Sequence, residues 1–466
     1  MPRGCDHGSD LMKLYNTLTR KTETLVGNDD QIRMYVCGIT PYAPSHLGHA
    51  MCAVIFDVLR RYLEHEGFEV THIQNFTDVD DKMIDAAIDA GVDLGDLAES
   101  NIDEYLTQLK QLNVLPASMY PRATHEIPKI IEIINGLINN DFAYELNGDV
   151  YFRVKNDKDY GKLSRRRIDD LLAGARLAID SNKEFPADFA LWKSQNPGEP
   201  SWDSPWGKGR PGWHIECTAM AIEYLGETVD IHGGGQDLVF PHHENEIAQS
   251  ESFTGVVPFS KFWIHNGTLG FGSEKMSKSL GNIVTIKQAL EDFDSDTLRM
   301  FFLASHYRSP LVYSVSVINS HDRALRRLKN ALSEREDGVG DEIETSQYWK
   351  EFTLSMDDDL NTPKALAVMF DLVKEINKSH DNGLKVNDAQ RALREMSSVL
   401  GFILEGRSDQ TMDESYLGSV IDLVVNVRNE LREQKQFAMA DRIRGELRKL
   451  GINIEDGESG GKWSRE

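Results

Sequence analysis

Residues 31–77 read QIRMYVCGITPYAPSHLGHAMCAVIFDVLRRYLEHEGFEVTHIQNFT, and this stretch decides the fold. Its apolar and β-branched start predicts a strand over 31–39, which a proline-rich break ends. Ser45 stands where a helix N-cap would, so we expect a helix over 46–66 that stops at the glycine after it. A second strand is predicted over 68–77. Strand, helix and strand within about 45 residues form a βαβ unit, so the sequence predicts a parallel α/β sheet of Rossmann type.

The same alternation returns late in the chain. We expect a strand over 228–232, a helix over 241–254 and another strand around 261–265. The catalytic α/β domain is therefore predicted in two halves with an insertion between them. We expect five regions, namely a first Rossmann half at 13–114, a connective insertion at 115–212, a second Rossmann half at 213–285, an all-α bundle at 286–405 and a small C-terminal module at 406–466.

Two irregular stretches lie between these elements. Residues 194–213 are rich in Pro, Gly and Trp, and we interpret them as a loop that forms a lid or a wall of the site. The second stretch is acidic and lies within residues 78–104, which hold ten acids and one lysine. Four of these acids could suggest a Mg²⁺ site, but a run of charges is usually a solvated helix face. We adopt the second interpretation for Asp78, Asp80, Asp81 and Asp85.

Composition limits the class of protein. The 466 residues carry 51 Lys and Arg against 75 Asp and Glu, a net charge of −24, and 40% are apolar, which excludes a disordered chain. The charge argues against a nonspecific nucleic-acid coat, because phosphates bind to Lys and Arg. We find no apolar run of 18 residues and no secretory leader, and four scattered cysteines make no disulfide framework. We expect a cytoplasmic protein without a membrane partner.

The motif His46-Leu47-Gly48-His49 opens the first predicted helix. Its two imidazoles are three residues apart and share a face, beside a helix N-terminus that attracts anions. Gly48 would let a flat ring or sugar approach the backbone. The alternative is two polar histidines near a helix cap. The motif is thus a phosphate site in outline.

A second motif, Lys275-Met276-Ser277-Lys278-Ser279, lies on a loop after the last strand of the second half. Two lysines three residues apart can close on a triphosphate and neutralise charge that grows during in-line attack. Such a loop alone is more often a solvated turn. Because both motifs follow strands of one predicted sheet, we assign Lys275 and Lys278 to the transition state of phosphate chemistry.

The two motifs, about 230 residues apart across a split Rossmann domain, resemble the signature pair of the class I aminoacyl-tRNA synthetases. The strings YVCGITPYAPSHLGHA, NFTDVDDKMI, GWHIECTAM, DIHGGGQDLVFPHHENEIAQSE and KMSKSLGN resemble the cysteinyl-tRNA synthetases in particular. The similarity runs from about residue 13 to the C-terminus. Leu47 stands where the class motif has Ile, a change that an inward-packing side chain tolerates.

The chain also offers thiols, imidazoles and carboxylates for a metal. His242 and Glu246 are four residues apart and His243 and Glu246 three, so helix geometry leaves the imidazole open. Cys37 and Cys217 are too far apart for a zinc-ribbon spacing. The resemblance implies that Cys37, Cys217, His242 and Glu246 hold one Zn²⁺ per chain.

The family resemblance also implies what this ion does. The substrate thiolate joins the zinc as an extra ligand, so that cysteine is distinguished from serine, because Zn²⁺ prefers sulfur to a hydroxyl. A difference this strong needs no proofreading domain. The connective insertion, about 100 residues long, is accordingly short for an editing domain.

Further site residues follow from the resemblance and from a glycine run. The family implies that Thr77 and Trp213 line the cysteine pocket and that Asp237 holds the amino group. Trp213 could instead be a packing aromatic and Asp237 a helix N-cap. The glycines after His232, beginning with Gly233, suit close approach of ribose and adenine, so we place His232, Gly233 and His265 near the nucleotide.

The C-terminal third is predicted to contact tRNA. Residues 357–376 resemble the helical bundle that follows the catalytic domain in this family, which implies a stem-contact role for the bundle. The segment 435–457 places four bases on one helix, which in this family belongs to the anticodon-binding module. They are Arg442, Arg444, Arg448 and Lys449. Trp463 could stack on a base or plug the tail of the module.

The resemblance implies a cysteine–tRNA ligase. Such an enzyme activates L-cysteine with ATP, accompanied by Mg²⁺, to cysteinyl-adenylate, and then transfers cysteine to the terminal ribose of tRNA(Cys). We expect a monomer. One alternative is a ligase that joins adenylated cysteine to an amino-sugar, although those relatives lack an anticodon-binding end. Another is a non-catalytic tRNA- or zinc-binding paralogue, which would predict damage to the two motifs, and both are intact.

Overall fold

The computed structural model describes residues 12–27, 30–167, 183–271, 274–275, 283–333, 338–404, 414–449, 452–457 and 460–465. The chain divides into two units, Met1–Leu404 and Glu405–Glu466. Within the described residues, no helix has both the length and the apolar character needed to cross a bilayer.

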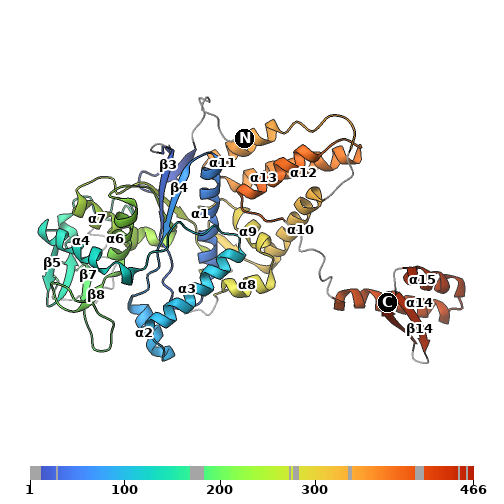
Figure 1. Ribbon diagram of the computed structural model, residues 1–466, viewed down its shortest axis with the longest axis horizontal. Helices are drawn as coiled ribbons and strands as arrows, with labels where there is room; N and C mark the ends of the chain where they lie inside the picture. The colour runs from blue at the N-terminus through green and yellow to red at the C-terminus, as the bar shows by residue number, and fades with distance from the viewer. Residues whose placement is uncertain are drawn as a thin grey trace. The chain divides into compact units, whose positions relative to one another are not determined.

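A parallel four-stranded sheet forms the centre of the first unit (Figure 1). Its strands are β3 (Gln31–Val36), β4 (Glu69–Gln74), β9 (Val229–Gly235) and β10 (Ser260–Asn266), in the order β10-β9-β3-β4. Helix α1 (Leu47–His65) joins β3 to β4. The predicted α/β fold is thus confirmed, with two halves of the chain contributing two strands each.

Strand β3 shows how helices cover both faces of this sheet. Alternate side chains of a strand point to opposite faces, so Ile32 and Met34 pack with α1, while Tyr35 packs with helix α6 (Trp213–Leu225). Figure 1 shows α1 and α6 on opposite sides of β3 and β4. All of these strand side chains are buried, which explains why the stretch lacks the alternation of a half-exposed strand.

Two helices follow β4 and carry the acidic stretch, α2 (Asp81–Ala90) and α3 (Leu94–Gln111). Asp80 is the N-cap of α2 and accepts a hydrogen bond from the backbone N–H of Met83 at 2.7 Å. Asp78 is buried and accepts hydrogen bonds from the backbone and hydroxyl of Thr124. The interpretation of these acids as a solvated helix face is therefore wrong for Asp78.

The insertion contains helix α4 (Ile127–Asn139) and an antiparallel sheet of four strands. In order these are β5 (Ala143–Leu146), β6 (Asp149–Phe152), β7 (Phe189–Ser194) and β8 (Gly209–Pro211). Strand β8 comes from the end of the stretch that was predicted to be only an irregular loop. It pairs with β7 and leads directly into α6 through Gly212.

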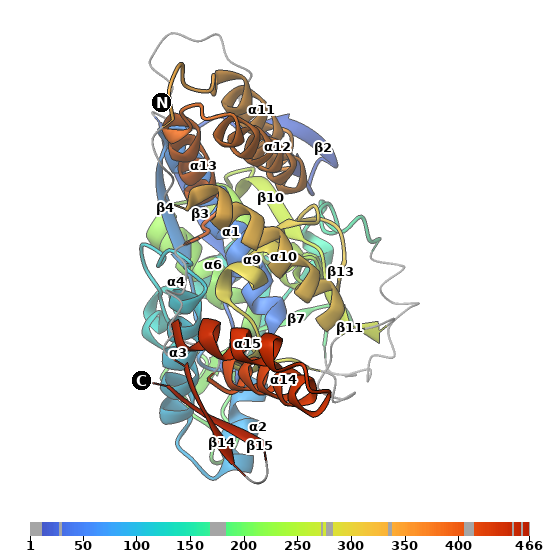
Figure 2. The same cartoon turned by 90° about the vertical axis from the view of Figure 1, so that its right-hand side faces the viewer.

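The rest of the first unit is mostly helical. Its helices are α7 (Glu244–Thr254), α8 (Ile286–Asp292), α9 (Ser295–Leu303), α10 (Val315–Leu332), α11 (Ser346–Asp357), α12 (Thr362–Asp381) and α13 (Asn387–Val399). Figure 2 shows α11, α12 and α13 side by side. Arg299 on α9 is fully buried and bonds both to Asp57 of α1, at 2.6 Å, and to the carbonyl of Leu400, so it ties the bundle to the sheet domain.

Short strands complete this unit. They are β1 (Lys13–Asn16), β2 (Lys21–Thr24), β11 (Leu269–Phe271), β12 (Glu274–Lys275) and β13 (Leu311–Tyr313). The first two form an antiparallel hairpin, and β11 pairs with both β12 and β13.

The second unit contains α14 (Glu414–Glu433), α15 (Phe437–Lys449), β14 (Ile452–Gly457) and β15 (Gly460–Arg465). The two strands form an antiparallel hairpin, which the sequence did not predict. Trp463 of β15 packs against the core of this unit and donates a hydrogen bond from Nε1 to Asp422 Oδ1 at 2.7 Å. This arrangement fits the interpretation of Trp463 as a plug of the module.

Candidate active site

A cavity of about 530 Å³ opens at the carboxyl ends of the parallel strands, where α/β sheets bind ligands. Its lining comes from the loop after β3, the first turns of α1, the first residue of α6 and the residues that follow β9 and β10. Cys37 lies at one part of this lining, and His46 and His49 lie at another. The site therefore joins a candidate metal centre to a candidate phosphate site.

Four buried side chains from separate segments meet beside this cavity. Cys37 follows β3, Cys217 lies on the second turn of α6, and His242 and Glu246 come from the segment around the start of α7. Their donor atoms all lie within 4.8 Å of one another. The Cys37 and Cys217 Sγ atoms are 3.8 Å apart, and His242 Nε2 lies 3.1 Å from Glu246 Oε1. The cluster can hold a metal ion.

The helix that carries Glu246 begins later than the sequence predicted. Residues Val239–His243 form a π-helical turn with a non-helical residue, Phe240, inside it, and regular α7 begins only at Glu244. His242 therefore belongs to this turn rather than to α7. The turn still directs its imidazole onto the Glu246 carboxylate, the pairing expected four residues apart.

The buried side chains of the cluster hold their protons unequally. Burial raises the pKa of the Cys37 thiol, as do the neighbouring Cys217 and Glu246. Burial also opposes ionisation of Cys217, but a hydrogen bond from Cys37 and the charge of His242 outweigh it and lower the pKa to about 6. At His242 the burial effect is outweighed by the charges of Cys217 and Glu246, which raise the pKa to about 10. A bound cation would replace the protons that this cluster shares.

A second set of donors overlaps the first. Cys37, His232, His243 and Glu246 also place ligand atoms within 4.8 Å of one another. His243 Nε2 lies 3.3 Å from Cys37 Sγ, and its Nδ1 lies 2.7 Å from Nε2 of His265. The first set contains two thiols and the second only one. Neither the distances between donor atoms nor the spacing in the sequence therefore decides whether His242 or His243 is the ligand.

One residue beside this cluster was not predicted from the sequence. His214 lies on the first turn of α6, and its Nδ1 is 2.9 Å from Nδ1 of His242. A metal-binding histidine commonly uses its other nitrogen for such an orienting contact. The signal in the sequence is the spacing of three residues between His214 and Cys217, which places both on one face of α6.

The HLGH motif forms the first turn of α1. His46, rather than the predicted Ser45, is the N-cap, and its Nδ1 accepts a hydrogen bond from the backbone N–H of Gly48 at 3.1 Å. His49 Nδ1 accepts from the backbone N–H of His46, which completes a capping box. The two rings stack 3.8 Å apart, and burial and the charge of His46 lower the pKa of His49. Both imidazoles reach the cavity in a fixed orientation.

Of the second motif, the structure describes little. The backbone of Lys275 pairs with Gly270 in the β11–β12 hairpin. Lys278 lies outside the described residues, as do the atoms of the Lys275 side chain that would meet a ligand. Strand β11 follows Asn266, Gly267 and Thr268, which line the cavity, so the hairpin starts from its edge.

Of the three residues that were predicted to form the cysteine pocket, two line the cavity and the third does not. Trp213 and Asp237 both line the cavity. The Trp213 ring stacks on His242, with centroids 4.3 Å apart, and the side chain is 38% exposed. Asp237 lies in a 3₁₀ turn, Gln236–Leu238, directly after the glycines that end β9. Thr77 is buried, its hydroxyl accepts from Asn75 at 3.3 Å, and it is not among the described residues that line the cavity.

His232 and Gly233, expected near the nucleotide, lie deep in the sheet. His232 is fully buried, stacks on Trp263 and places Nε2 3.6 Å from Cys37 Sγ. A Cβ at Gly233 would come within 2.2 Å of the Phe56 ring of α1, so packing alone requires a glycine there. His265 is buried between His243 and Thr17, to whose hydroxyl its Nδ1 lies 2.8 Å away, and neither His232 nor His265 lines this cavity.

Comparisons with protein families agree with this geometry. Residues 23–323 match the model of the tRNA synthetases class I (C) catalytic domain. Residues 351–405, which include the second half of α11 and all of α12 and α13, match the model of the DALR domain. The first match spans all four strands of the parallel sheet and the whole cavity.

Curated relatives match almost the full length. The chain is 50% identical over 455 residues to a cysteine–tRNA ligase of Dehalococcoides mccartyi, with 97% of this chain and 99% of the relative covered. It is 45% identical over 481 residues to a cysteine–tRNA ligase of Heliobacterium modesticaldum, with the same coverage. Among solved structures, methionyl-tRNA synthetase of Mycobacterium tuberculosis with methionyl-adenylate has a TM-score of 0.57 at 16% identity, covering 79% of this chain and 89% of that one, a likeness of fold.

Proposed function

The chain belongs to the cysteine–tRNA ligases of the class I aminoacyl-tRNA synthetase family, and we propose that it recognises cysteine at a zinc ion held by Cys37, Cys217, His242 and Glu246. The enzyme joins cysteine to tRNA with ATP. The observation that carries the proposal is the buried cluster of two thiols, an imidazole and a carboxylate at the edge of the cavity. Such a donor set is typical of Zn²⁺.

The residues fit a resident zinc ion. A carboxylate and two thiols supply anionic donors, and the His214 contact would orient the His242 ring. Zinc bound there would supply a ligand position that prefers the thiol of cysteine over the hydroxyl of serine. The preference for the His242 set over the His243 set rests on its second thiol and on Trp213, which stacks on His242 and lines the cavity.

The other residues of the cavity then position the two reacting groups. Asp237 is acidic and lines the cavity together with Trp213, which suits it to hold the substrate ammonium while the indole covers the side chain. Thr77 would support the cysteine pocket from behind the residues that line the cavity. With the amino acid held in this way, its carboxylate attacks the α-phosphate of ATP and pyrophosphate leaves. Positioning of this kind supplies much of the acceleration of such a transfer.

We assign the phosphates to the other part of the cavity. His46, Gly48 and His49 lie at the first turn of α1 and line the cavity, and the positive end of the helix dipole there favours an anion. Lys275 and Lys278 would neutralise charge on the pentacoordinate phosphorus in the transition state. Mg²⁺ would accompany ATP as the counter-ion of its phosphates. His232 and Gly233 would support the nucleotide from within β9 rather than touch it across this cavity.

The transfer step needs tRNA(Cys), whose terminal ribose 2′-hydroxyl takes the cysteinyl group from the adenylate. We assign the connective insertion at 115–212 and the helical bundle at 286–405 to the acceptor end, and the module at 406–466 to the anticodon loop. The bundle contains the DALR match, and the described part of α15 carries Arg442, Arg444 and Arg448. We expect the enzyme to work as a cytoplasmic monomer.

The amino-sugar ligase is the weaker alternative. Its relatives lack an anticodon-binding end, whereas the match to cysteine–tRNA ligases covers 97% of this chain and 99% of the relative. A non-catalytic paralogue is disfavoured because HLGH and KMSKS are intact.

The decisive experiment is ATP–pyrophosphate exchange on metal-analysed protein, with cysteine and serine as competing substrates, and tRNA charging measured in parallel. We expect exchange with cysteine only, one zinc per chain and charging of tRNA(Cys). Exchange without charging would favour the amino-sugar ligase, and zinc-loaded protein without exchange would favour the paralogue.

A further inference from the structure

A carboxylate on α2 connects that helix to the insertion sheet. Asp81 is the first residue of α2, and its Oδ2 lies 2.6 Å from Lys193 Nζ of β7, while its Oδ1 accepts a hydrogen bond from the guanidinium of Arg210 in β8. The two cations hold the pKa of Asp81 below its usual range, against the opposing effect of partial burial. The ion pairs bridge two parts of the chain about 110 to 130 residues apart.

Arg210 is the unusual member of this group because it is only 4% exposed. Its guanidinium has a second carboxylate partner, Glu199, with Nε and Oε2 3.3 Å apart. Glu199 comes from the insertion itself, so the ion pair with Asp81 connects this cation to α2. A buried cation depends on its counter-charges, so loss of Asp81 would leave Arg210 undercompensated and free to turn toward Glu199.

The two ends of the Asp81–Arg210 pair are close in sequence to Thr77, which lies outside the cavity lining, and to Trp213, which is a wall of the proposed cysteine pocket. Asp81 follows Thr77 by four residues, and Arg210 precedes Trp213 by three. The link from Arg210 to Trp213 is stiff, because Gly212 donates its N–H to Leu191 of β7 at 2.9 Å. A Cβ at Gly212 would lie 2.1 Å from a carbonyl oxygen of β7, so the backbone there lies directly against β7.

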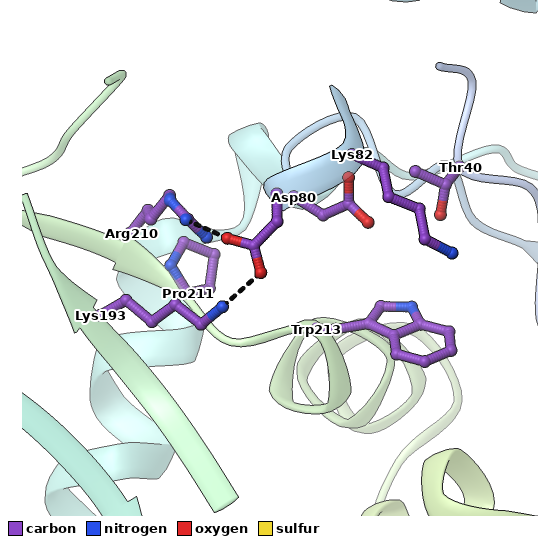
Figure 3. Close-up of a pocket in the computed structure, with 8 residues that line it drawn as sticks. Thr40, Asp80, Lys82, Lys193, Arg210, Pro211 and Trp213 are labelled. Atoms are coloured by element: carbon purple, nitrogen blue, oxygen red, sulfur yellow. Dashed lines mark hydrogen bonds and ion pairs between the residues drawn. The ribbon is translucent and has the colours of Figure 1, made fainter. Parts of the chain in front are cut away.

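A small cavity of about 190 Å³ lies beside this group (Figure 3). Asp81, Lys193, Arg210 and Trp213 all line it. It shares Thr40, Lys82 and Trp213 with the larger cavity, so Trp213 borders both cavities. The Trp213 ring rests on His242 on the inner side, and the Asp81–Arg210 pair fixes the backbone that precedes it.

We propose that Asp81 and Arg210 are positioning residues, which form a clamp that holds Trp213 over the amino-acid pocket. This inference rests on the proposed function, which makes Trp213 a wall of that pocket. The clamp sets the position of β8 against α2, and β8 in turn sets the start of α6, on which Trp213 is the first residue. It acts on the binding of cysteine and not on the phosphate chemistry.

The test compares three variants of the full-length, zinc-loaded enzyme. Asp81→Asn keeps the shape and removes the charge, Asp81→Glu keeps the charge, and Glu184→Gln breaks a matched ion pair to Arg153 in the same insertion, away from both cavities. We expect Asp81→Asn to raise KM for cysteine about fivefold, with kcat and KM for ATP changed less than about twofold. Asp81→Glu should recover most of the cysteine affinity, and Glu184→Gln should not change it.

Three results would count against the clamp or against the pocket that it serves. Equal losses with cysteine and ATP, together with a lowered Tm, would show that the ion pair is only structural and would overturn the proposal. An unchanged KM for cysteine in Asp81→Asn, in a protein where Trp213→Ala raises it, would refute the clamp and leave the pocket intact. If Trp213→Ala also has no effect, the assignment of the pocket itself fails.

Discussion

The metal cluster and the HLGH turn lie on the same cavity but are built in opposite ways. The metal cluster gathers Cys37, Cys217, His242 and Glu246 from three distant parts of the chain, and all four are buried. The HLGH turn consists of consecutive residues whose side chains cap their own helix. Tertiary structure therefore creates the metal cluster, whereas local helix geometry creates the HLGH turn. Substitutions in the two regions should consequently impair different properties of the enzyme.

The largest effect is expected on the phosphate side. Lys278→Ala should slow adenylate formation by about 10³-fold, because its charge is used mainly in the transition state. Cysteine binding should hardly change. The measurement is single-turnover adenylate formation together with the dissociation constant of cysteine.

Lys287→Ala is the matched control, since Lys287 is exposed on α8 just beyond the same segment. Adenylation at the wild-type rate in Lys278→Ala would remove this lysine from the mechanism.

A somewhat smaller effect is expected from a substitution in the metal cluster. It should change the selection of cysteine over serine and not the rate alone. Cys217→Ser should lose the zinc and reduce the preference for cysteine over serine about 10²-fold, because a hydroxyl is a poor replacement for a thiolate ligand. Zinc content by elemental analysis and exchange with both amino acids measure this directly.

Cys52→Ser is the control for Cys217→Ser. Cys52 lines the cavity outside the metal cluster, and burial raises its pKa to about 12, so it is a thiol at neutral pH. This variant should keep its zinc. Full zinc content in Cys217→Ser would contradict the ligand set.

The same contrast explains what could be predicted from the sequence. Strands β3 and β4 and helix α1 follow from residues 31–77, and the predicted helix 46–66 differs from α1 by one residue at each end. The C-terminal hairpin was missed because its glycine-rich turn obscures the short alternation around Ile452 and Ile454. Strand β8 was missed because three residues that depend on pairing with β7 carry no strand pattern of their own.

The candidate site divides along the same line. HLGH could be placed at a helix start from its own sequence, although the N-cap is His46 and not Ser45, because an imidazole nitrogen can also accept the capping hydrogen bond. The metal set could not be derived from spacing, since its two cysteines are 180 residues apart. Only the fold brings them within 4.8 Å of the other donors, and it also brings His214 against His242.

A third effect, intermediate in size, is expected at His214, which contacts the proposed zinc ligand His242. His214→Phe keeps an aromatic ring but removes the nitrogen that faces His242, so zinc affinity should fall about tenfold. Competition with a chelator of known affinity gives the dissociation constant. The same substitution at His321, which lies on α10, should leave that constant unchanged. Equal affinities for His214→Phe and the wild-type protein would mean that His242 needs no orienting partner.

The smallest effect concerns stability at the HLGH turn. Burial and the charge of His46 lower the pKa of His49, so the folded protein keeps this imidazole neutral, while the unfolded chain binds a proton near pH 6.5. The unfolded state thus binds more protons, and stability is lost as the pH falls below 6.5. His49→Gln removes this titration, and a Gln at the same helix position can still accept from the backbone N–H of His46. Between pH 7.5 and pH 5.5, the free energy of unfolding of the variant should therefore fall by about 1 kcal/mol less than that of the wild-type protein. The measurement is the free energy of unfolding of both proteins at the two pH values. Identical losses in both proteins would show that His49 is protonated in the folded state, and the phosphate side of the cavity would then carry a positive charge at acidic pH.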